Sequence, residues 1–364
     1  MSGVKCTNKE TAQERSYYTE REWARITAKE EEEKKHQRKL AIFLGILTAV
    51  TLLMCYLVYF FVIRSHDYEL DHPFASNDRV YGIQSGLTVS DTAESFAANL
   101  CVTDQDVNNT LPIGAYSAAL FDLNGRQVVY GRDLFTKRSP ASLTKIMTAM
   151  VALKYGNLDD MVTVTETALD IEYGSSVCDI KVGDRLSLKQ LLYGLMIASG
   201  NDAAMMIAEH VGGSVAGFVD LMNQEARALG ATGTHFTNPH GLTDSDHYTT
   251  AYDLYLMFQA AMEYDVFMDM INRKNYYAEY TRVDGSAVAV TWESTNHYFT
   301  SLADAPDNVI VYGGKTGTTD DAGACLSLLA KDLYGNPYLA VVLHAGNKDE
   351  LYQEMNQILS LIEN

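Results

Sequence analysis

The pattern of apolar and polar positions divides the chain into a polar leader, one long apolar run and a mixed remainder. The run, residues 40–63, reads LAIFLGILTAVTLLMCYLVYFFVI and contains 24 consecutive positions without a charge. As a helix it would be ~36 Å long, which exceeds the ~30 Å hydrocarbon core of a bilayer. A helix buried in a soluble protein rarely lacks a polar face over so many turns. The pattern therefore predicts a transmembrane helix.

A cleaved signal peptide is the main alternative for this run. Signal peptides have apolar regions of about 7–15 residues that end in a small-residue cleavage site. This run ends in Tyr-Phe-Phe-Val-Ile-Arg after a 39-residue leader. Four basic residues at 34–39 precede it and acidic residues follow it. The positive-inside rule then predicts an uncleaved single-pass anchor in the cell membrane, with a cytoplasmic N-terminus and everything after residue 63 outside.

The segments on either side of the run differ in character. In the leader, residues 1–39, four glutamates at 30–33 stand three to four residues before basic side chains, the spacing of ion pairs on a solvated helix. Its few apolar positions form no heptad, which disfavours a coiled coil. Residues 64–110 mix Asp, Ser, Asn and Gly without a period, as is typical of a stalk. We therefore predict a cytoplasmic leader, an anchor at 40–63, a stalk at 64–110 and a folded domain at 111–364.

Within the predicted domain, strand patterns lie at both ends and helical patterns between them. Two hairpins are expected, the first with Asn-Gly at its turn. Their strands are Ala115–Phe121 with Gln127–Tyr130, and Cys325–Ala330 with Tyr338–His344. Apolar residues at three-to-four spacing predict six helices, at Leu143–Lys154, Leu188–Ala198, Asp202–Val211, Val215–Leu229, Ala251–Met262 and Glu350–Ile362. This order predicts an α/β domain whose sheet combines distant parts of the chain.

Composition and charge narrow the possible classes of protein. With 47% hydrophobic residues, 25 Gly and 6 Pro, the chain is not collagen-like, Pro-rich or wholly disordered. The net charge is −19, and residues 1–39 hold 10 basic and 8 acidic side chains, so the remainder carries a net charge of −21. Such acidity without a basic patch disfavours polyanionic ligands, and we expect no nucleic-acid partner.

Candidate chemistry begins with Ser142 and Lys145, which share one face of a predicted helix after Pro140. A serine hydroxyl is a poor nucleophile until a base takes its proton, and the lysine amine could serve as that base. In the first helical turn the serine N–H is also free to stabilise an oxyanion. An S-x-x-K quartet alone is common on surface helices. Here, however, Ser199-Gly200-Asn201 and Lys315-Thr316-Gly317 follow it in order.

The three motifs together resemble the signature of penicilloyl-serine enzymes. The segments SPASLTKIMTAMVALKYG, LLYGLMIASGNDAA, FTNPHGLTDSDHYTTAYDL and GGKTGTTDDAG are similar, more specifically, to the D-alanyl-D-alanine carboxypeptidase family of low-molecular-mass penicillin-binding proteins. The resemblance covers about residues 111–362. It implies the β-lactamase/DD-peptidase-like transpeptidase fold, an α/β (α+β) architecture with an antiparallel sheet, flanking helices and an all-α part. It also implies that residues 111–364 form a serine DD-peptidase catalytic domain without a cofactor.

The resemblance implies a role for each motif residue. Ser142 would attack the carbonyl between the last two D-alanines of a peptidoglycan stem peptide, and water would hydrolyse the acyl-enzyme. Lys145 would be the base, which requires that burial and the nearby Lys315 lower its pKa from the ordinary ~10.4. Ser199 would relay a proton to the leaving amine, and Asn201 would hold a substrate carbonyl. Read alone, this Ser-Gly-Asn segment would be an ordinary helix cap.

The resemblance also implies that the K-T-G segment binds the C-terminal end of the substrate. Lys315 and Thr316 would bind the terminal carboxylate, and Gly317 would leave room for the substrate backbone. The backbone N–H of Thr318 would be the second oxyanion donor, beside the N–H of Ser142. Without the other motifs, this segment would be a Gly-rich strand end with a surface lysine.

Two histidines and one missing arginine affect this interpretation. We expect His240 and His247 to be structural, because the sequence has no H-E-x-x-H motif and no Cys/His cluster with zinc spacing, so no metal is predicted.

Related carboxypeptidases often place an arginine before the C-terminal helix to assist the substrate carboxylate. This chain has no arginine after Arg282. Either Lys348 replaces that arginine, or Lys315 acts alone.

The cysteines suggest one further hypothesis. Of the five, three lie beyond the predicted anchor, and an odd number cannot all pair with one another. The family positions of Cys178 and Cys325 flank the active site, which leads to the hypothesis of a disulfide between them.

The leading interpretation is a membrane-anchored serine-type D-Ala-D-Ala carboxypeptidase, with peptidoglycan stem peptides as substrates and β-lactam antibiotics as acylating inhibitors. One alternative is a class A-like β-lactamase, which needs a positioned carboxylate for fast deacylation. Another is a non-enzymatic β-lactam sensor, but a 39-residue leader without a zinc-protease motif is too short for the usual output module. A pseudoenzyme is disfavoured because all the motif residues are present.

Overall fold

The computed structural model describes residues 32, 35–40, 42, 45–54, 56, 99–108 and 110–362. The chain forms two compact units, Met1–Leu87 and Thr88–Asn364. In the first unit, the helix Lys35–Met54 has 20 residues and a mean hydropathy of 1.5, and none of its described residues is buried. It is long and apolar enough to cross a membrane. Residues 1–31, most of 55–63 and residues 64–98 of the predicted leader, anchor and stalk lie outside the described residues.

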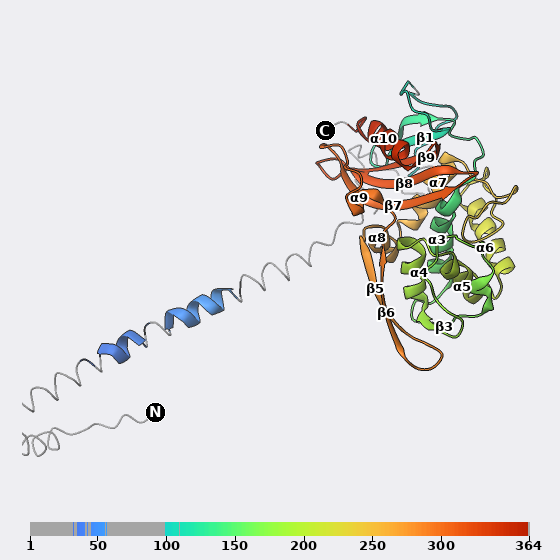
Figure 1. The fold of residues 1–364 in the computed structure, drawn as a ribbon. Coiled ribbons are helices and arrows are strands. Elements are labelled where there is room, and N and C mark those ends of the chain that lie inside the picture. Colours follow the sequence, from blue (N-terminus) through green and yellow to red (C-terminus); the bar gives the residue numbers. More distant parts are fainter. Residues whose placement is uncertain are drawn as a thin grey trace, which may run out of the picture. The chain divides into compact units, whose positions relative to one another are not determined.

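The second unit is built on a five-stranded antiparallel sheet (Figure 1). Its order is β2-β1-β9-β8-β7, so the first two strands of the domain lie beside the last. Both predicted hairpins, β1–β2 and β8–β9, are confirmed. The strands are β1 (Ser117–Asp122), β2 (Gln127–Arg132), β7 (Ile310–Thr319), β8 (Gly323–Lys331) and β9 (Pro337–Ala345).

The first hairpin turn contains the expected Asn-Gly pair, within a longer loop. Asp122 pairs with Gln127, which leaves a four-residue loop. The Asp122 carboxylate accepts hydrogen bonds from the backbone N–H groups of Asn124 and Gly125. The positive φ of the loop, 54°, falls on Arg126. The aspartate side chain therefore organises this turn by bonding the backbone ahead of it.

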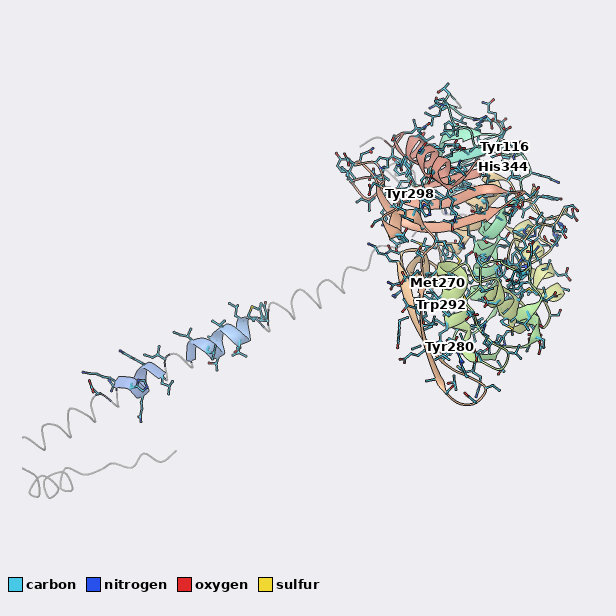
Figure 2. All side chains as sticks on the ribbon, viewed as in Figure 1. Tyr116, Met270, Tyr280, Trp292, Tyr298 and His344 are labelled. Carbon is cyan, nitrogen blue, oxygen red and sulfur yellow. The ribbon has the colours of Figure 1, made fainter. Side chains whose placement is uncertain are left out.

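A second sheet, in the order β3-β4-β5-β6, was not predicted from the sequence. Two of its strands have only three residues, too few for a periodic signal. Trp292 lies on the edge strand β6 (Figure 2). It is buried, and its indole N–H donates a hydrogen bond to the carbonyl of Cys178 (3.3 Å). The strands are β3 (Met161–Thr163), β4 (Arg185–Ser187), β5 (Asn275–Thr281) and β6 (Ala287–Glu293).

The six predicted helices are confirmed with small shifts at their ends. They are α3 (Thr144–Tyr155), α4 (Leu188–Ile197), α5 (Asn201–Gly212), α6 (Val215–Ala228), α7 (Ala251–Ala261) and α10 (Lys348–Leu359). Four short helical segments carried no clear signal: η2 (Ala141–Leu143), η3 (Glu166–Leu169), α8 (Asp265–Ile271) and α9 (His297–Thr300). Residues 144–152 of α3 are all buried, which explains why this central helix has no polar face.

The two faces of the main sheet pack against different helices. The buried face of α10, with Leu351, Met355 and Ile358, joins one core with the sheet. On the opposite face, Tyr255 of α7 stacks on Phe121 of β1 with ring centroids 4.1 Å apart. This three-layer arrangement, with the helices α4–α6 to one side, is the α+β architecture that the sequence predicted (Figure 1).

The domain begins earlier than the predicted boundary at residue 111. Cys101 donates its backbone N–H to the hydroxyl of Tyr255 (2.8 Å), and Val107 forms a β-bridge with Gly131. The described residues 99–108 therefore belong to the compact unit rather than to a separate stalk. The sequence missed this because these few contacts depend on distant residues and leave no periodic pattern.

Candidate active site

The first motif lies where the 3-10 turn η2 runs into α3. Lys145, in the first turn of α3, places its Nζ 2.9 Å from the Oγ of Ser142. Ala141 has a φ of 47°, a left-handed conformation that is uncommon for a residue with a side chain. Such strain costs about 1–3 kcal/mol and persists only where the surroundings hold it. The predicted contact between serine and lysine is therefore present, on a strained turn.

Lys145 is fully buried and has three hydrogen-bond partners. Besides Ser142, its Nζ contacts the Oδ1 of Asn201 at 2.7 Å and the carbonyl of His240 at 2.8 Å. Burial, and then the positive charge of Lys315, hold the pKa of Lys145 well below its usual range. A neutral amine donates two hydrogen bonds and accepts one. It can therefore donate to Asn201 and His240 and accept the hydroxyl proton of Ser142.

The second and third motifs meet at Lys315. Its Nζ, also buried, donates to the Oγ of Ser199 at 2.9 Å and to the carbonyl of Thr316 at 2.8 Å. Burial lowers the pKa of Lys315 to about 7. Ser199 has a φ of 59°, a second left-handed residue in the site. Two lysines with depressed pKa values thus lie beside two serine hydroxyls.

Asn201 begins helix α5, and the loop before that helix forms one wall of the site. The N–H of Asn201 donates to the carbonyl of Ser176 at 2.8 Å. Next along the helix, the buried Asp202 carboxylate accepts from the backbone N–H groups of Cys178 (2.8 Å) and Ile180 (3.2 Å). Burial raises the pKa of Asp202 despite these donors. Ser176 and Asp202 were not predicted as site residues, although an aspartate in a first helical turn is a recognisable capping signal.

Strand β7 brings the K-T-G segment against the turn that carries Ser142. A Cβ at Gly317 would lie 2.9 Å from the backbone nitrogen of Ser142 and 3.0 Å from the carbonyl oxygen of Pro140. Only glycine permits this close approach without displacing the turn. The next residue, Thr318, lies in the same pocket as Ser142. The two residues predicted to supply oxyanion N–H groups therefore line one cavity.

The pocket is lined by part of each motif and by the start of α10. The motif residues in the lining are Ser142, Ser199, Thr316, Gly317 and Thr318, whereas Lys145, Asn201 and Lys315 lie behind them. Lys348, the first residue of α10, lies in the lining, as do His297 and Tyr352, whose rings stack 4.6 Å apart. Sequence reasoning singled out Lys348 but missed the two aromatic residues, which lie outside any motif. Among the described residues that line this pocket there is no Asp or Glu.

The two histidines of the downstream motif contact the site without lining it. His240 offers its backbone carbonyl to Lys145, and His247 bonds the Oγ1 of Thr144 at 2.8 Å. Within the part of the chain that the structure describes, no group of three or more His, Cys, Asp or Glu side chains is placed to hold a metal ion.

The hypothesis of a disulfide between Cys178 and Cys325 is wrong. Both are buried free thiols. The Sγ of Cys178 packs so closely on Gly200 that a Cβ there would lie 2.3 Å from it. The Sγ of Cys325 donates to the carbonyl of Ala322 instead. Two cysteines can both flank a site and still have side chains that contact different residues, which the sequence alone does not show.

Comparisons with known proteins agree with this arrangement. Residues 103–347 match the model of the D-alanyl-D-alanine carboxypeptidase family, peptidase family S11. The chain is 33% identical to the D-alanyl-D-alanine carboxypeptidase DacF of Bacillus subtilis over 255 aligned residues. The aligned region covers 67% of this chain and 61% of that protein. It is 34% identical to the D-alanyl-D-alanine carboxypeptidase of Streptomyces sp. strain K15 over 213 aligned residues, and this region covers 56% of this chain and 71% of that protein.

Solved structures give the same result. The fold is similar to the crystal structure of the Streptomyces K15 DD-transpeptidase, with a TM-score of 0.64 and 30% identity, over 70% of this chain and 98% of that one. It is also similar to the D-alanyl-D-alanine carboxypeptidase DacD from Francisella tularensis, with a TM-score of 0.59 and 27% identity, over 72% of this chain and 73% of that one. The chain therefore belongs to the D-alanyl-D-alanine carboxypeptidase family of serine peptidases.

Proposed function

We propose that this protein is a membrane-anchored serine D-Ala-D-Ala carboxypeptidase that removes the terminal D-alanine from peptidoglycan stem pentapeptides. The observation that carries the proposal is the 2.9 Å contact between the Nζ of Lys145 and the Oγ of Ser142. It pairs a nucleophile with a base whose pKa is depressed, in a pocket that also holds Ser199 and borders the buried Lys315.

Acylation follows from the contacts of the two lysines. Lys145 takes the hydroxyl proton as the Oγ of Ser142 attacks the carbonyl between the last two D-alanines. The backbone N–H groups of Ser142 and Thr318 stabilise the oxyanion. When the C–N bond breaks, the proton that Lys145 took passes through the hydroxyl of Ser199 to the leaving amine, and an acyl ester on Ser142 remains. Water then gives a proton to Lys145 as it attacks this ester, and that proton returns to the Oγ of Ser142 as the shortened peptide leaves.

Substrate orientation uses the remaining polar groups of the pocket. Because the Oδ1 of Asn201 accepts from Lys145, its Nδ2 is the group that donates to a substrate carbonyl. Lys315 and Thr316 bind the terminal carboxylate, beside Gly317, where the substrate backbone passes. Lys348, which lines the same pocket from α10, supplies a second positive charge in place of the arginine found in relatives.

Reaction with β-lactams follows from the same chemistry. A β-lactam presents a strained amide and a carboxylate to the same groups, so it acylates Ser142 and acts as an inhibitor. Fast hydrolysis of that ester in a class A-like β-lactamase requires a positioned carboxylate. None lines this pocket among the described residues, which favours a long-lived acyl-enzyme.

The location of the domain follows from the apolar segment. The helix Lys35–Met54 supports a single-pass anchor within residues 40–63. Basic residues before it favour a cytoplasmic leader at 1–39 and an extracytoplasmic catalytic domain. Peptidoglycan lies on that side of the membrane, so the anchor keeps the pocket near its substrate.

D-alanine release tests the proposal directly. The full chain in detergent should release D-alanine from a pentapeptide ending in D-Ala-D-Ala, and Ser142→Ala should not. The exposed Ser286→Ala is the matched control, because its hydroxyl bonds only Asp284 in a surface turn. A fluorescent penicillin should label the parent chain and the control stably. Equal release by the parent chain and Ser142→Ala would refute the assignment.

A further inference from the structure

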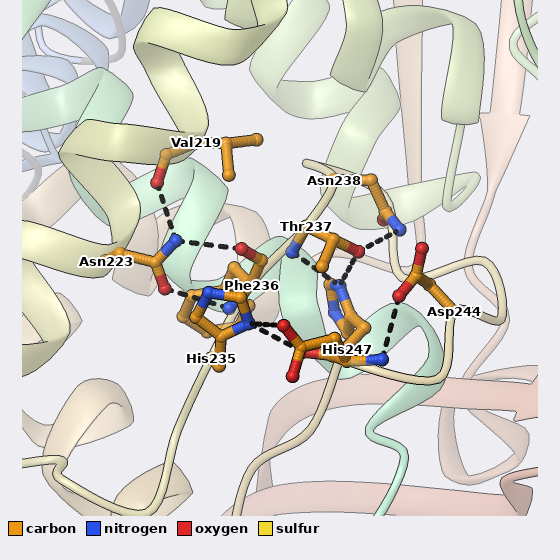
Figure 3. Close-up of polar contacts among 9 residues, drawn as sticks. Val219, Asn223, His235, Phe236, Thr237, Asn238, Asp244 and His247 are labelled. Carbon is orange, nitrogen blue, oxygen red and sulfur yellow. Dashed lines mark hydrogen bonds and ion pairs between the residues drawn. The ribbon is translucent and has the colours of Figure 1, made fainter.

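A buried chain of hydrogen bonds connects the loop 237–247 to the turn that carries Ser142. His247, which is 3% exposed, lies between them. Its Nδ1 faces the backbone N–H of Thr237 at 3.1 Å and the Oγ1 of the same residue at 3.2 Å (Figure 3). A backbone N–H can only donate, so Nδ1 carries no proton. The ring proton therefore lies on Nε2.

The direction of the remaining bonds follows from that proton. The Nε2–H of His247 donates to the Oγ1 of Thr144 at 2.8 Å. The hydroxyl of Thr144 donates in turn to the carbonyl of Ala141, also at 2.8 Å. Burial lowers the pKa of His247 to about 4, which keeps the ring neutral and the direction fixed. The chain ends on the peptide group that joins Ala141 to Ser142.

That carbonyl belongs to the strained part of the turn. Ala141 is the residue with a φ of 47°. Gly241, from the same loop, packs directly on this carbonyl, since a Cβ there would lie 1.8 Å from the oxygen. The loop also supplies the His240 carbonyl to Lys145. One loop therefore contacts both the turn of the nucleophile and the amine of its base.

We propose that His247 is a positioning residue for Ser142. Acting through Thr144, its neutral ring holds the Ala141 carbonyl in the strained turn, and this aims the hydroxyl of Ser142 at Lys145 and its N–H at the oxyanion. The inference rests on the proposed function, because it takes Ser142 as the nucleophile. It assigns His247 no contact with substrate and no proton transfer.

Matched pairs of variants separate this role from packing. Thr144→Val removes the hydroxyl at similar size, while Thr144→Ser keeps it. His247→Leu removes both ring contacts, while His247→Gln offers an amide oxygen to Thr237 and an amide N–H to Thr144. Acylation of the full chain in detergent by a fluorescent penicillin is measured over a range of concentrations, which separates the dissociation constant from the first-order acylation rate.

We expect Thr144→Val and His247→Leu to slow the first-order acylation rate by about 10- to 100-fold, since a displacement of about 1 Å has effects of this size. The dissociation constant should change less than about threefold, and Thr144→Ser and His247→Gln should recover most of the rate. Parent-like acylation by Thr144→Val, or equal losses in the Ser and Val variants, would overturn the inference. If Ser142→Ala were labelled as fast as the parent chain, the proposed function itself would fail.

Discussion

The charge of Lys315 predicts how activity depends on pH. Lys315 is 1% exposed, and burial lowers its pKa to about 7, while the pKa of Lys145 is well below its usual range. The proposed mechanism needs a neutral Lys145, which its lowered pKa favours, and a charged Lys315. Raising the pH from 7 to 9 should therefore remove the charge that attracts the substrate carboxylate and leave the base intact.

The size of the effect follows from the titration of one group. Half of the free enzyme carries the Lys315 charge at pH 7 and only about 1% at pH 9, so kcat/KM should fall about 50-fold over this range. A bound carboxylate favours the protonated amine, so kcat should change less than KM. Below pH 7 the charge is complete, and kcat/KM falls only where Lys145 gains a proton.

Two substrates provide the assay. Release of D-alanine from a peptide ending in D-Ala-D-Ala is compared with release of D-alaninamide from the same peptide with an amidated C-terminus. The amide lacks the carboxylate, so its kcat/KM should not show the decline above pH 7. If both substrates declined in parallel, or if KM for the free acid stayed constant between pH 6 and 9, Lys315 would not act through its charge.

Four further outcomes follow from particular residues. Lys315→Met should lower kcat/KM for the free-acid peptide at least about 50-fold, and less for the amide, because it removes the charge that binds the carboxylate. At pH 6 it should also raise the thermal midpoint, which corresponds to about 1–2 kcal/mol of stability, because it removes a buried ammonium. The pKa of Lys315 is lower in the folded chain than in the unfolded one, so this gain should shrink between pH 7 and 10.5, and a lower midpoint would contradict the prediction. Gly241→Ala should destabilise the protein by about 1–3 kcal/mol in denaturant titration, because its Cβ would overlap a carbonyl oxygen; an unchanged midpoint would contradict this. Lys348→Gln should raise KM for the free-acid peptide about two- to fivefold and leave KM for the amide unchanged. Unfolding without reductant should expose Cys178 and Cys325 to a thiol reagent, whereas a shortfall of two thiols would restore the rejected disulfide.

The main sheet and the long helices could be predicted because their periodicity is strong. The predicted strands at Cys325–Ala330 and Tyr338–His344 and the predicted helix at Ala251–Met262 begin and end within one or two residues of the observed elements. The second sheet could not be predicted. The three residues of β3 and β4 are too few to show a period of two, and β5 and β6 expose most of one face.

Contacts in the candidate site could be predicted only where the spacing of two residues along the sequence determines the distance between their side chains. Ser142 and Lys145 meet because positions three apart share a helical face. The contact of Lys315 with Ser199 joins residues 116 positions apart, and it depends on how strand β7 lies against the connection between α4 and α5. Resemblance to a family suggested that the motifs share one site, but it did not suggest this contact. The placement of His297 beside Tyr352 had no such signal, because stacking across 55 positions is a property of the folded chain.

The coupling between the two lysines gives the substrate carboxylate a second effect. The positive charge of Lys315 is, after burial, the main cause that lowers the pKa of Lys145. A carboxylate bound at Lys315 cancels part of that charge, so the pKa of Lys145 rises when substrate binds. The amine is therefore a weaker base while the pocket is empty, and it becomes a stronger base when a hydroxyl proton is to be taken from Ser142. A peptide without the carboxylate does not produce this change, so a terminal carboxylate favours both binding and the acceptance of the proton.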